Sequence, residues 1–293
     1  MQLRLQSTVL VIAGLLVANV CLAGQLAAGG TPEPTKGLLY CPSNPDNPTF
    51  RAELSAALGG LAVDYFDARF ATPTVEQMQE YLAVFTWVNY YYHDKWAMSE
   101  HLADYVDLGG KVILGQWCLA DFGGGSAAYR IIMPDYCPVY GGSYSTSAPH
   151  YTGDGTDCVH QGVAEYSSQY MDLAYLFPGH RSDGTMSTGT LAVAWRPDRR
   201  VYYSPGNTGQ SYGSGDWAQL TANMVLCENQ PGDLNCDGLV NAFDIDPFVL
   251  ALVDPDAYAA EHPYCDHMLA DINGDGVVNA FDIDPFVTLL VGG

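Results

Sequence analysis

The sequence predicts an α/β protein, with a three-layer, parallel-sheet domain followed by a small all-α module. Between residues 37 and 228, short apolar segments alternate with amphipathic segments of helical length, an order that favours a parallel sheet covered on both faces. From residue 233 onward, a twelve-residue segment rich in Asp, Asn and Gly occurs twice, and each copy runs into a short apolar stretch. A linker over residues 229–232 separates these two regions, and the second extends to residue 293.

The first domain is expected to alternate strands and helices along the chain. In chain order, the expected elements are a strand at 38–41, a helix at 51–58, a strand at 61–66, a helix at 74–81, a strand at 83–88, a helix with Met98, Leu102, Tyr105 and Val106 on one face, a strand at 111–117, a hairpin of 191–195 with 201–204, and a helix at 217–226.

Local signals support individual elements. Thr74 followed by Gln77 three residues later is a capping-box pattern for a helix start. Gly109 and Gly110 are typical of a helix end. The continuous apolar run at 83–88 is typical of a buried parallel strand.

The duplicated segment has the spacing of an EF-hand calcium loop. Oxygen-bearing side chains fall at loop positions 1, 3, 5, 9 and 12 of each copy, and position 6 is Gly. We therefore expect two bound Ca²⁺ ions, with the residue at position 7 contributing its carbonyl. The predicted ligands are Asp233, Asn235, Asp237, Leu239, Asn241 and Asp244 in the first copy, and Asp271, Asn273, Asp275, Val277, Asn279 and Asp282 in the second. Two acidic Asx-turns without metal are the alternative.

Two such loops in register, each followed by a short helix, resemble a type I dockerin module over residues 231–293. The resemblance implies calcium-dependent attachment to a cohesin-like protein, recognised through Ala242-Phe243 and Ala280-Phe281. Position 12 is Asp, as in dockerins, whereas calmodulin-type loops carry Glu. Packing of both Phe side chains into the module core or onto residues 37–228 is the alternative.

Charge and the N-terminal segment indicate a secreted protein. The formal net charge is −22, and no Lys or Arg follows Arg200, which argues against nucleic acid and anionic membranes as partners. Residues 1–23 read as a signal peptide, with an apolar stretch at 9–20, and residues 24–36 read as a flexible leader.

Seven of the eight cysteines follow the expected cleavage site, and an oxidising compartment favours their pairing. Cys236 and Cys265 lie in the same small module and form the first expected disulfide. Cys118 with Cys137 is the second expectation. Because the remaining five cysteines are odd in number, at least one does not pair within the chain.

The first domain resembles the class I glutamine amidotransferase-like fold, in its trehalose-utilisation-like branch. The residues that carry this resemblance are 109–115 and 200–206. The family's Gly-x-Cys-x-Gly elbow is absent, because Cys118 follows Gln116 and Trp117 one position late. Ser204-Pro205-Gly206 stands where the family has His-Pro-Glu. We therefore predict that the domain is not a glutaminase, since a thiol without its base is a weak nucleophile.

Ligands of open α/β sheets bind beyond the carboxyl ends of the strands, where this chain places aromatic and polar residues. Aromatic faces stack on sugar rings, and amides and carboxylates bind hydroxyls. The predicted substrate-binding residues are Asn89, Tyr90, Tyr91, Gln116 and Trp117. The predicted catalytic residues are Asp94, Asp121 and His93, against the alternative that His93 and Asp94 form an ordinary loop pair. Trp87 and Trp96 are expected in the core, and His150, His160 and His180 on surface loops.

These features predict a secreted, dockerin-bearing protein that acts in extracellular polysaccharide binding or degradation. If a bond is cleaved, O-glycosyl hydrolysis is the reaction class we expect. The alternative is a catalytically inactive amidotransferase-like scaffold or interaction protein. Hydrolysis by Cys118 is a third interpretation.

Overall fold

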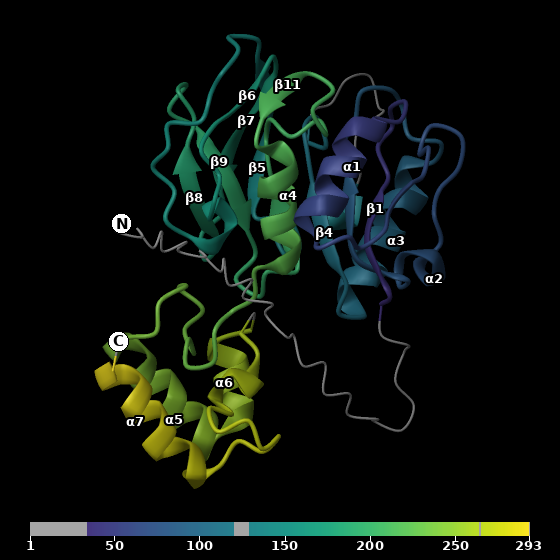
Figure 1. Ribbon diagram of the computed structural model, residues 1–293. Coiled ribbons are helices and arrows are strands. Elements are labelled where there is room, and N and C mark those ends of the chain that lie inside the picture. Colours follow the sequence, from purple (N-terminus) through teal and green to yellow (C-terminus); the bar gives the residue numbers. More distant parts are fainter. Residues whose placement is uncertain (1–33, 120–128, 264, 293) are drawn as a thin grey trace, which may run out of the picture. The chain divides into compact units, whose positions relative to one another are not determined.

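A computed structural model describes residues 34–119, 129–263 and 265–292 (Figure 1). The expected signal peptide lies outside these ranges, as does Asp121. Among the residues described, no helix is both long and apolar enough to cross a membrane.

The α/β domain is built on a sheet of seven described strands. They are β1 (Lys36–Tyr40), β2 (Val63–Tyr65), β3 (Tyr81–Thr86), β4 (Lys111–Leu114), β8 (Arg181–Thr185), β9 (Leu191–Trp195) and β10 (Val201–Tyr203). Their order is β2-β1-β3-β4-β10-β9-β8. The first five pair in parallel, while β9 is antiparallel to β10 and β8. The parallel part therefore has the doubly wound order, with its switch point between β1 and β3.

Helices cover both faces of this sheet. They are α1 (Pro48–Ala57), α2 (Val75–Met78), α3 (Lys95–Asp107) and α4 (Trp217–Leu226). The chain moves in opposite directions across the sheet from β1 to β2 and from β3 to β4, so right-handed crossovers put α1 and α3 on opposite faces. In Figure 1, α1 and α4 lie together on one side, and α2 packs against α3 on the other.

Most elements expected from the sequence are confirmed, with shifted ends. The Thr74 hydroxyl accepts from the Gln77 amide at 3.3 Å, and the Gln77 side chain accepts from the Thr74 amide at 2.9 Å, so the capping box is present. The prediction that this helix reaches residue 81 was wrong: α2 ends at Met78 because β3 begins at Tyr81. The final helix at 217–226 and the hairpin of β9 and β10 are confirmed.

The segment between β4 and β9 contains regular structure that the sequence did not predict. It includes η1 (Tyr129–Ile132), β5 (Val139–Ser145), η2 (Cys158–His160), β6 (Tyr166–Ser168) and β7 (Met171–Leu176), besides β8. β5 pairs antiparallel with β7, and β6 pairs with β11 (Gly213–Gly215). Gly, Ser and Tyr dominate β5, β6 and β11, so the apolar periodicity that marks a strand is weak there.

The C-terminal residues form short helices around a second core. They are η3 (Ala242–Asp244), α5 (Ile245–Val253), α6 (Pro255–Glu261), η4 (His267–Ala270), η5 (Ala280–Asp282) and α7 (Ile283–Gly292). The core consists of Leu234, Phe248, Ala251, Tyr258, Ala270 and Phe286. Phe248 and Phe286, which are equivalent residues of the two copies, stack at 4.0 Å.

Candidate functional site

The switch point between β1 and β3 is bordered by polar residues that bond to one another. The Asn89 side-chain amide donates to the Asn44 side chain at 2.8 Å and to the Tyr212 hydroxyl at 3.0 Å. The Ser43 hydroxyl donates to the Tyr90 carbonyl at 2.7 Å. Asn89, predicted to bind substrate, is therefore partly buried and already holds the ends of the two strands together.

The turn after β4 holds a tryptophan in a strained backbone conformation. Trp117 has a φ of 64°, in the left-handed region that non-glycine residues rarely adopt. A Cβ added at Gly115 would lie 2.4 Å from the Asn207 carbonyl oxygen, so only glycine fits this approach. The strained position of this turn therefore holds an indole.

Cys118, the next residue, is buried rather than presented to solvent. Its Sγ lies 3.6 Å from the Thr86 carbonyl oxygen and 3.9 Å from the Tyr92 hydroxyl. Burial raises the pKa of the thiol far above its usual range, which disfavours the thiolate. The expected disulfide with Cys137 was wrong: both thiols are free, as is Cys41.

Asp172 of β7, whose role the sequence did not predict, forms a hydrogen bond with the turn after β4. It is fully buried and accepts from the Trp117 backbone amide at 2.7 Å and from the Tyr203 hydroxyl. Burial raises its pKa to about 7, since the apolar surroundings disfavour the charged carboxylate. A single Asp within an otherwise unremarkable strand gives no sequence signal of this contact.

Gln116, predicted to bind substrate, is fully buried, and its side-chain amide forms its hydrogen bonds within the protein. With its amide oriented to suit its neighbours, the nitrogen donates to the Pro205 and Tyr170 carbonyls at 3.0 and 2.6 Å. The oxygen accepts from the Met171 amide and the Trp117 indole at 3.2 Å each. Gln116 thus fixes the loops above the sheet and leaves no group directed at solvent.

The aromatic residues that follow β3 and β4 fall into a buried set and an exposed set. Trp87 is fully buried, as predicted, and Trp117 is only 8% exposed. The prediction that Trp96 lies in the core was wrong: it is 55% exposed and packs on Tyr129 at 5.7 Å between ring centroids. Helix α3 begins at residue 95, so Trp96 lies on its exposed first turn. The exposed aromatic residues therefore include Trp96 and Tyr129 besides Tyr90 and Tyr91.

The predicted catalytic residues are placed as follows. Asp94 is the N-cap of α3, and its carboxylate accepts from the amides of Trp96 and Ala97 at 2.9 and 3.0 Å. His93 is exposed, and its backbone amide donates to the Ala68 carbonyl at 2.8 Å. The helix cap gives Asp94 a structural role whatever its chemistry, and Asp121 lies outside the described residues.

Two of the three histidines expected on surface loops are buried instead. His160 is 5% exposed and His180 is 8% exposed, while His150 is exposed. His160 Nδ1 lies 2.6 Å from the Asp183 carboxylate, and Nε2 lies 2.9 Å from the Tyr166 hydroxyl. This chain of contacts ties η2 to β8 and β6.

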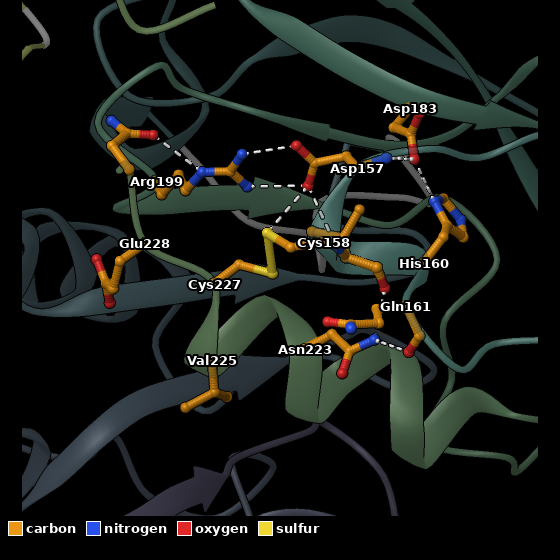
Figure 2. The surroundings of a disulfide bond; sticks show 12 residues. Asp157, Cys158, His160, Gln161, Asp183, Arg199, Asn223, Val225, Cys227 and Glu228 are labelled. Atoms are coloured by element: carbon orange, nitrogen blue, oxygen red, sulfur yellow. Dashed lines mark hydrogen bonds and ion pairs between the residues drawn. A yellow bond between two sulfur atoms is a disulfide. The ribbon is translucent and has the colours of Figure 1, made fainter. Parts of the chain in front are cut away.

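A disulfide joins η2 to the end of α4, a pairing the sequence did not predict (Figure 2). Cys158 and Cys227 are separated by 69 residues. Asp157 lies beside the sulfurs and forms an ion pair with Arg199 at 2.6 Å. Asp157 and the two sulfurs are close enough to suggest a metal centre, but the sulfurs are bonded to each other. The cluster therefore anchors the segment between β4 and β9 to α4 and to the turn after β9. The predicted Cys236–Cys265 disulfide is confirmed.

In the first repeat copy, the loop carboxylates accept hydrogen bonds from backbone amides. Asp233 accepts from the amides of Asp237 and Gly238, both at 3.0 Å. Asp244 accepts from Asn235 at 3.1 Å and from Asn241 at 2.8 Å. The first and twelfth positions thus hold the loop closed from both ends.

The second copy repeats this pattern residue by residue. Asp271 accepts from Asp275 at 3.1 Å and from Gly276 at 2.8 Å. Asp282 accepts from Asn273 at 3.1 Å and from Asn279 at 2.9 Å. Gly276 has a φ of 85°, as the sharp turn at position 6 requires.

Asp233 and Asp244 are almost fully buried although both are acidic. Burial, with the neighbouring carboxylates of Asp244 and Asp237, raises the pKa of Asp233 to about 6. Arg181 donates to the Cys236 carbonyl of this loop at 3.1 Å, but not to either carboxylate. Burying acids is costly, and a hard cation among the loop oxygens would relieve that cost. The donor set in both copies therefore fits Ca²⁺.

No protein-family model matches the chain, and no curated protein matches it. Among solved structures, a cytoplasmic protein from Salmonella typhimurium is 10% identical and covers 64% of this chain and 97% of its own, with a TM-score of 0.48. A protein described as ThuA-like from Bacteroides uniformis is 12% identical and covers 69% and 95%, with a TM-score of 0.44. One described as a GMP synthase component from Thermoplasma acidophilum is 10% identical and covers 65% and 92%, with a TM-score of 0.43. Similarity this low says nothing about the activity of the chain. The strand order defines its class, a mixed α/β fold with a mostly parallel sheet.

Proposed function

We propose that the chain is a secreted, dockerin-bearing protein that binds or helps degrade extracellular polysaccharide and attaches to a cohesin-like partner through a calcium-loaded C-terminal module. The observation that carries this proposal is the matching hydrogen-bond pattern of two loops with EF-hand spacing. Two disulfides favour an oxidising compartment, which agrees with secretion.

The partner surface is the apolar face that the two copies share. Phe243 is 78% exposed and Phe281 is 79% exposed, so neither packs into the module core. Other apolar residues are also exposed at equivalent positions in both copies: Leu239 with Val277, Ile245 with Ile283, Val249 with Val287, and Val253 with Val291. Exposed apolar patches of this extent mark interaction sites. Because the patch occurs twice, either copy can present it.

Carbohydrate contact is proposed at the carboxyl edge of the sheet. Trp96 and Tyr129 offer a pair of exposed rings there, with Tyr90 and Tyr91 exposed at the end of β3. Their faces suit stacking on pyranose rings, whereas Trp117 is too buried to offer more than its rim.

A second function, that of an inactive amidotransferase-like scaffold, is favoured by the turn after β4. Trp117 occupies its strained position, and the Cys118 thiol is buried. This function differs from the first in predicting no glycan binding by the α/β domain.

Two assays test the proposal on the full chain without its signal peptide. In a calcium-dependent pull-down from the native secretome, the wild type should retain a partner that the Phe243→Ala/Phe281→Ala variant loses. A polysaccharide panel scored for binding and for reducing-end release tests the α/β domain. The variant is Trp96→Ala, and the control is Tyr175→Ala, which removes an exposed ring that packs on Tyr140 at 5.6 Å. No glycan binding would leave the scaffold function, and no calcium-dependent partner would refute the dockerin assignment.

A further inference from the structure

A small antiparallel sheet lies beyond the carboxyl edge of the main sheet. β6 pairs with β11 on one side and with residues around His150 on the other. The Tyr151 amide donates to the Tyr166 carbonyl at 2.9 Å, and the Gln169 amide donates to the Tyr212 carbonyl at 2.7 Å. Tyr212 belongs to the loop that follows β10, so this contact ties the small sheet to the strand ends at which ligands of such folds bind (Figure 1).

One face of the small sheet is aromatic and packed. The rings of Tyr151 and Tyr166, which lie opposite each other on neighbouring strands, stack at 4.7 Å with an interplanar angle of 6°. His160 stacks on Tyr151 at 4.6 Å, and Trp217 packs on Tyr166 at 4.5 Å. This packing fixes the strands, so side chains on the opposite face are held in place.

The opposite face is polar. Ser167 pairs directly with His150 on one neighbouring strand and with Ser214 on the other, so the three side chains form a row across one face. The hydroxyls of Ser167 and Ser214 lie 3.1 Å apart. Glu165 lies directly before β6 and is exposed.

These four side chains, with Tyr151, Tyr166 and Gly215, line a cavity of about 330 Å³. Its size is near the lower end of the range for small-molecule sites, which extends from roughly 300 to 1,000 Å³. The cavity therefore has room for one sugar residue of a polysaccharide, while the other sugar residues lie outside it. Two hydroxyls, an imidazole and a carboxylate supply both donors and acceptors, as a polyhydroxylated ring requires.

The negative charge at the cavity favours neutral sugars over acidic ones. Glu165 lines it, no Lys or Arg side chain does among the described residues, and the Asp216 carboxylate accepts from the Glu165 backbone amide at 3.0 Å. We infer that the cavity formed by His150, Glu165, Ser167 and Ser214 is a subsite for a neutral sugar residue of the bound polysaccharide. This inference rests on the proposed carbohydrate function, and an acidic sugar would be repelled.

The test is calorimetric titration of the full chain, with calcium, using cellotetraose, xylotetraose, mannotetraose and maltotetraose, with tetragalacturonate as the acidic probe. The variants are Glu165→Gln and Ser214→Ala, two exposed side chains whose replacement leaves the packed aromatic face untouched. Glu53→Gln, on the exposed side of α1, is the matched control. For at least one neutral oligosaccharide, Glu165→Gln should lower affinity by about 10-fold or more, the range expected when a charged hydrogen-bond acceptor is lost. Ser214→Ala should lower it less, and the control should not change it.

Three outcomes overturn the inference, and they can be told apart. If the wild type binds an oligosaccharide, Trp96→Ala abolishes binding and both cavity variants bind normally, the subsite is wrong while the proposed function stands. If tetragalacturonate binds more tightly than every neutral probe, the charge argument is wrong. If the wild type binds neither these probes nor any polysaccharide of the panel, the carbohydrate function itself fails.

Discussion

The α/β domain and the C-terminal repeat achieve order in different ways. The sheet of the domain is buried between helices, and its core includes large side chains such as Trp87, Tyr202 and Phe85. The repeat has a core of six residues, and its loops instead close around buried carboxylates such as Asp233 and Asp282. The domain is therefore organised around a large apolar core, whereas the repeat combines a small apolar core with buried carboxylates.

The largest expected effect is on the repeat and comes from calcium. Residues 231–293 carry twelve carboxylates and no Lys or Arg, so without a cation the loops repel themselves. At calcium a thousand-fold above Kd, binding should stabilise the module by about 4 kcal/mol per site. Residues 229–293 expressed alone should gain helical circular dichroism with calcium and lose it with chelator.

Asp233→Ala and Asp271→Ala provide internal controls for that experiment. Each should lower the calcium stoichiometry from two ions to one, as measured by titration calorimetry. Equal helicity with calcium and with chelator would mean that the module needs no metal, and the contrast between the two regions would disappear.

The next effect concerns the α/β domain and its unexpected disulfide. Cys158 and Cys227 close a loop with a sequence separation of 69. Replacing both by Ser should lower the free energy of unfolding by about 4 kcal/mol in the chain-entropy model. Urea unfolding of the domain should show this loss while the calcium titration of the repeat stays unchanged. A matching loss of calcium affinity would mean that the two regions are not independent.

A smaller effect is expected from the pH dependence of Asp172. Its pKa is raised to about 7 in the folded chain, against an ordinary value of 3.8. Between these two values the folded state keeps a proton that the unfolded state loses, so the stability present below pH 3.8 is lost as the pH rises to about 7. In the wild type, the free energy of unfolding should therefore fall by a few kcal/mol between about pH 4 and pH 8, and Asp172→Asn should abolish this fall. Urea unfolding of both proteins at several pH values measures it; identical pH profiles would show that Asp172 ionises normally.

The sequence allowed the order of strands and helices over residues 37–117 to be predicted, because each element there has its own periodicity and cap. It did not allow the strands between β4 and β9 to be predicted, since strands such as β8, with the sequence RSDGT, carry no alternating pattern. The site shows the same division. The matching hydrogen bonds of Asp233 and Asp271 could be anticipated from the repeated spacing, and their role as calcium ligands stays a prediction. The contact of Asp172 with Trp117 joins residues far apart in the chain, and no local rule reports it.

The smallest expected effect decides what Asp94 does at the edge of the α/β domain. Its carboxylate caps α3 through the amides of Trp96 and Ala97, so Asp94→Ala should cost about 1 kcal/mol of stability. Asn is an equally good cap but cannot act as an acid or base, so Asp94→Asn should leave the free energy of unfolding unchanged. If the wild type releases reducing ends and Asp94→Asn abolishes that release at full stability, Asp94 is catalytic. If Asp94→Asn retains the activity, the predicted catalytic role is wrong and the carboxylate serves the helix alone. The pair of variants thereby separates a cap from a catalyst at a position where the sequence supports both.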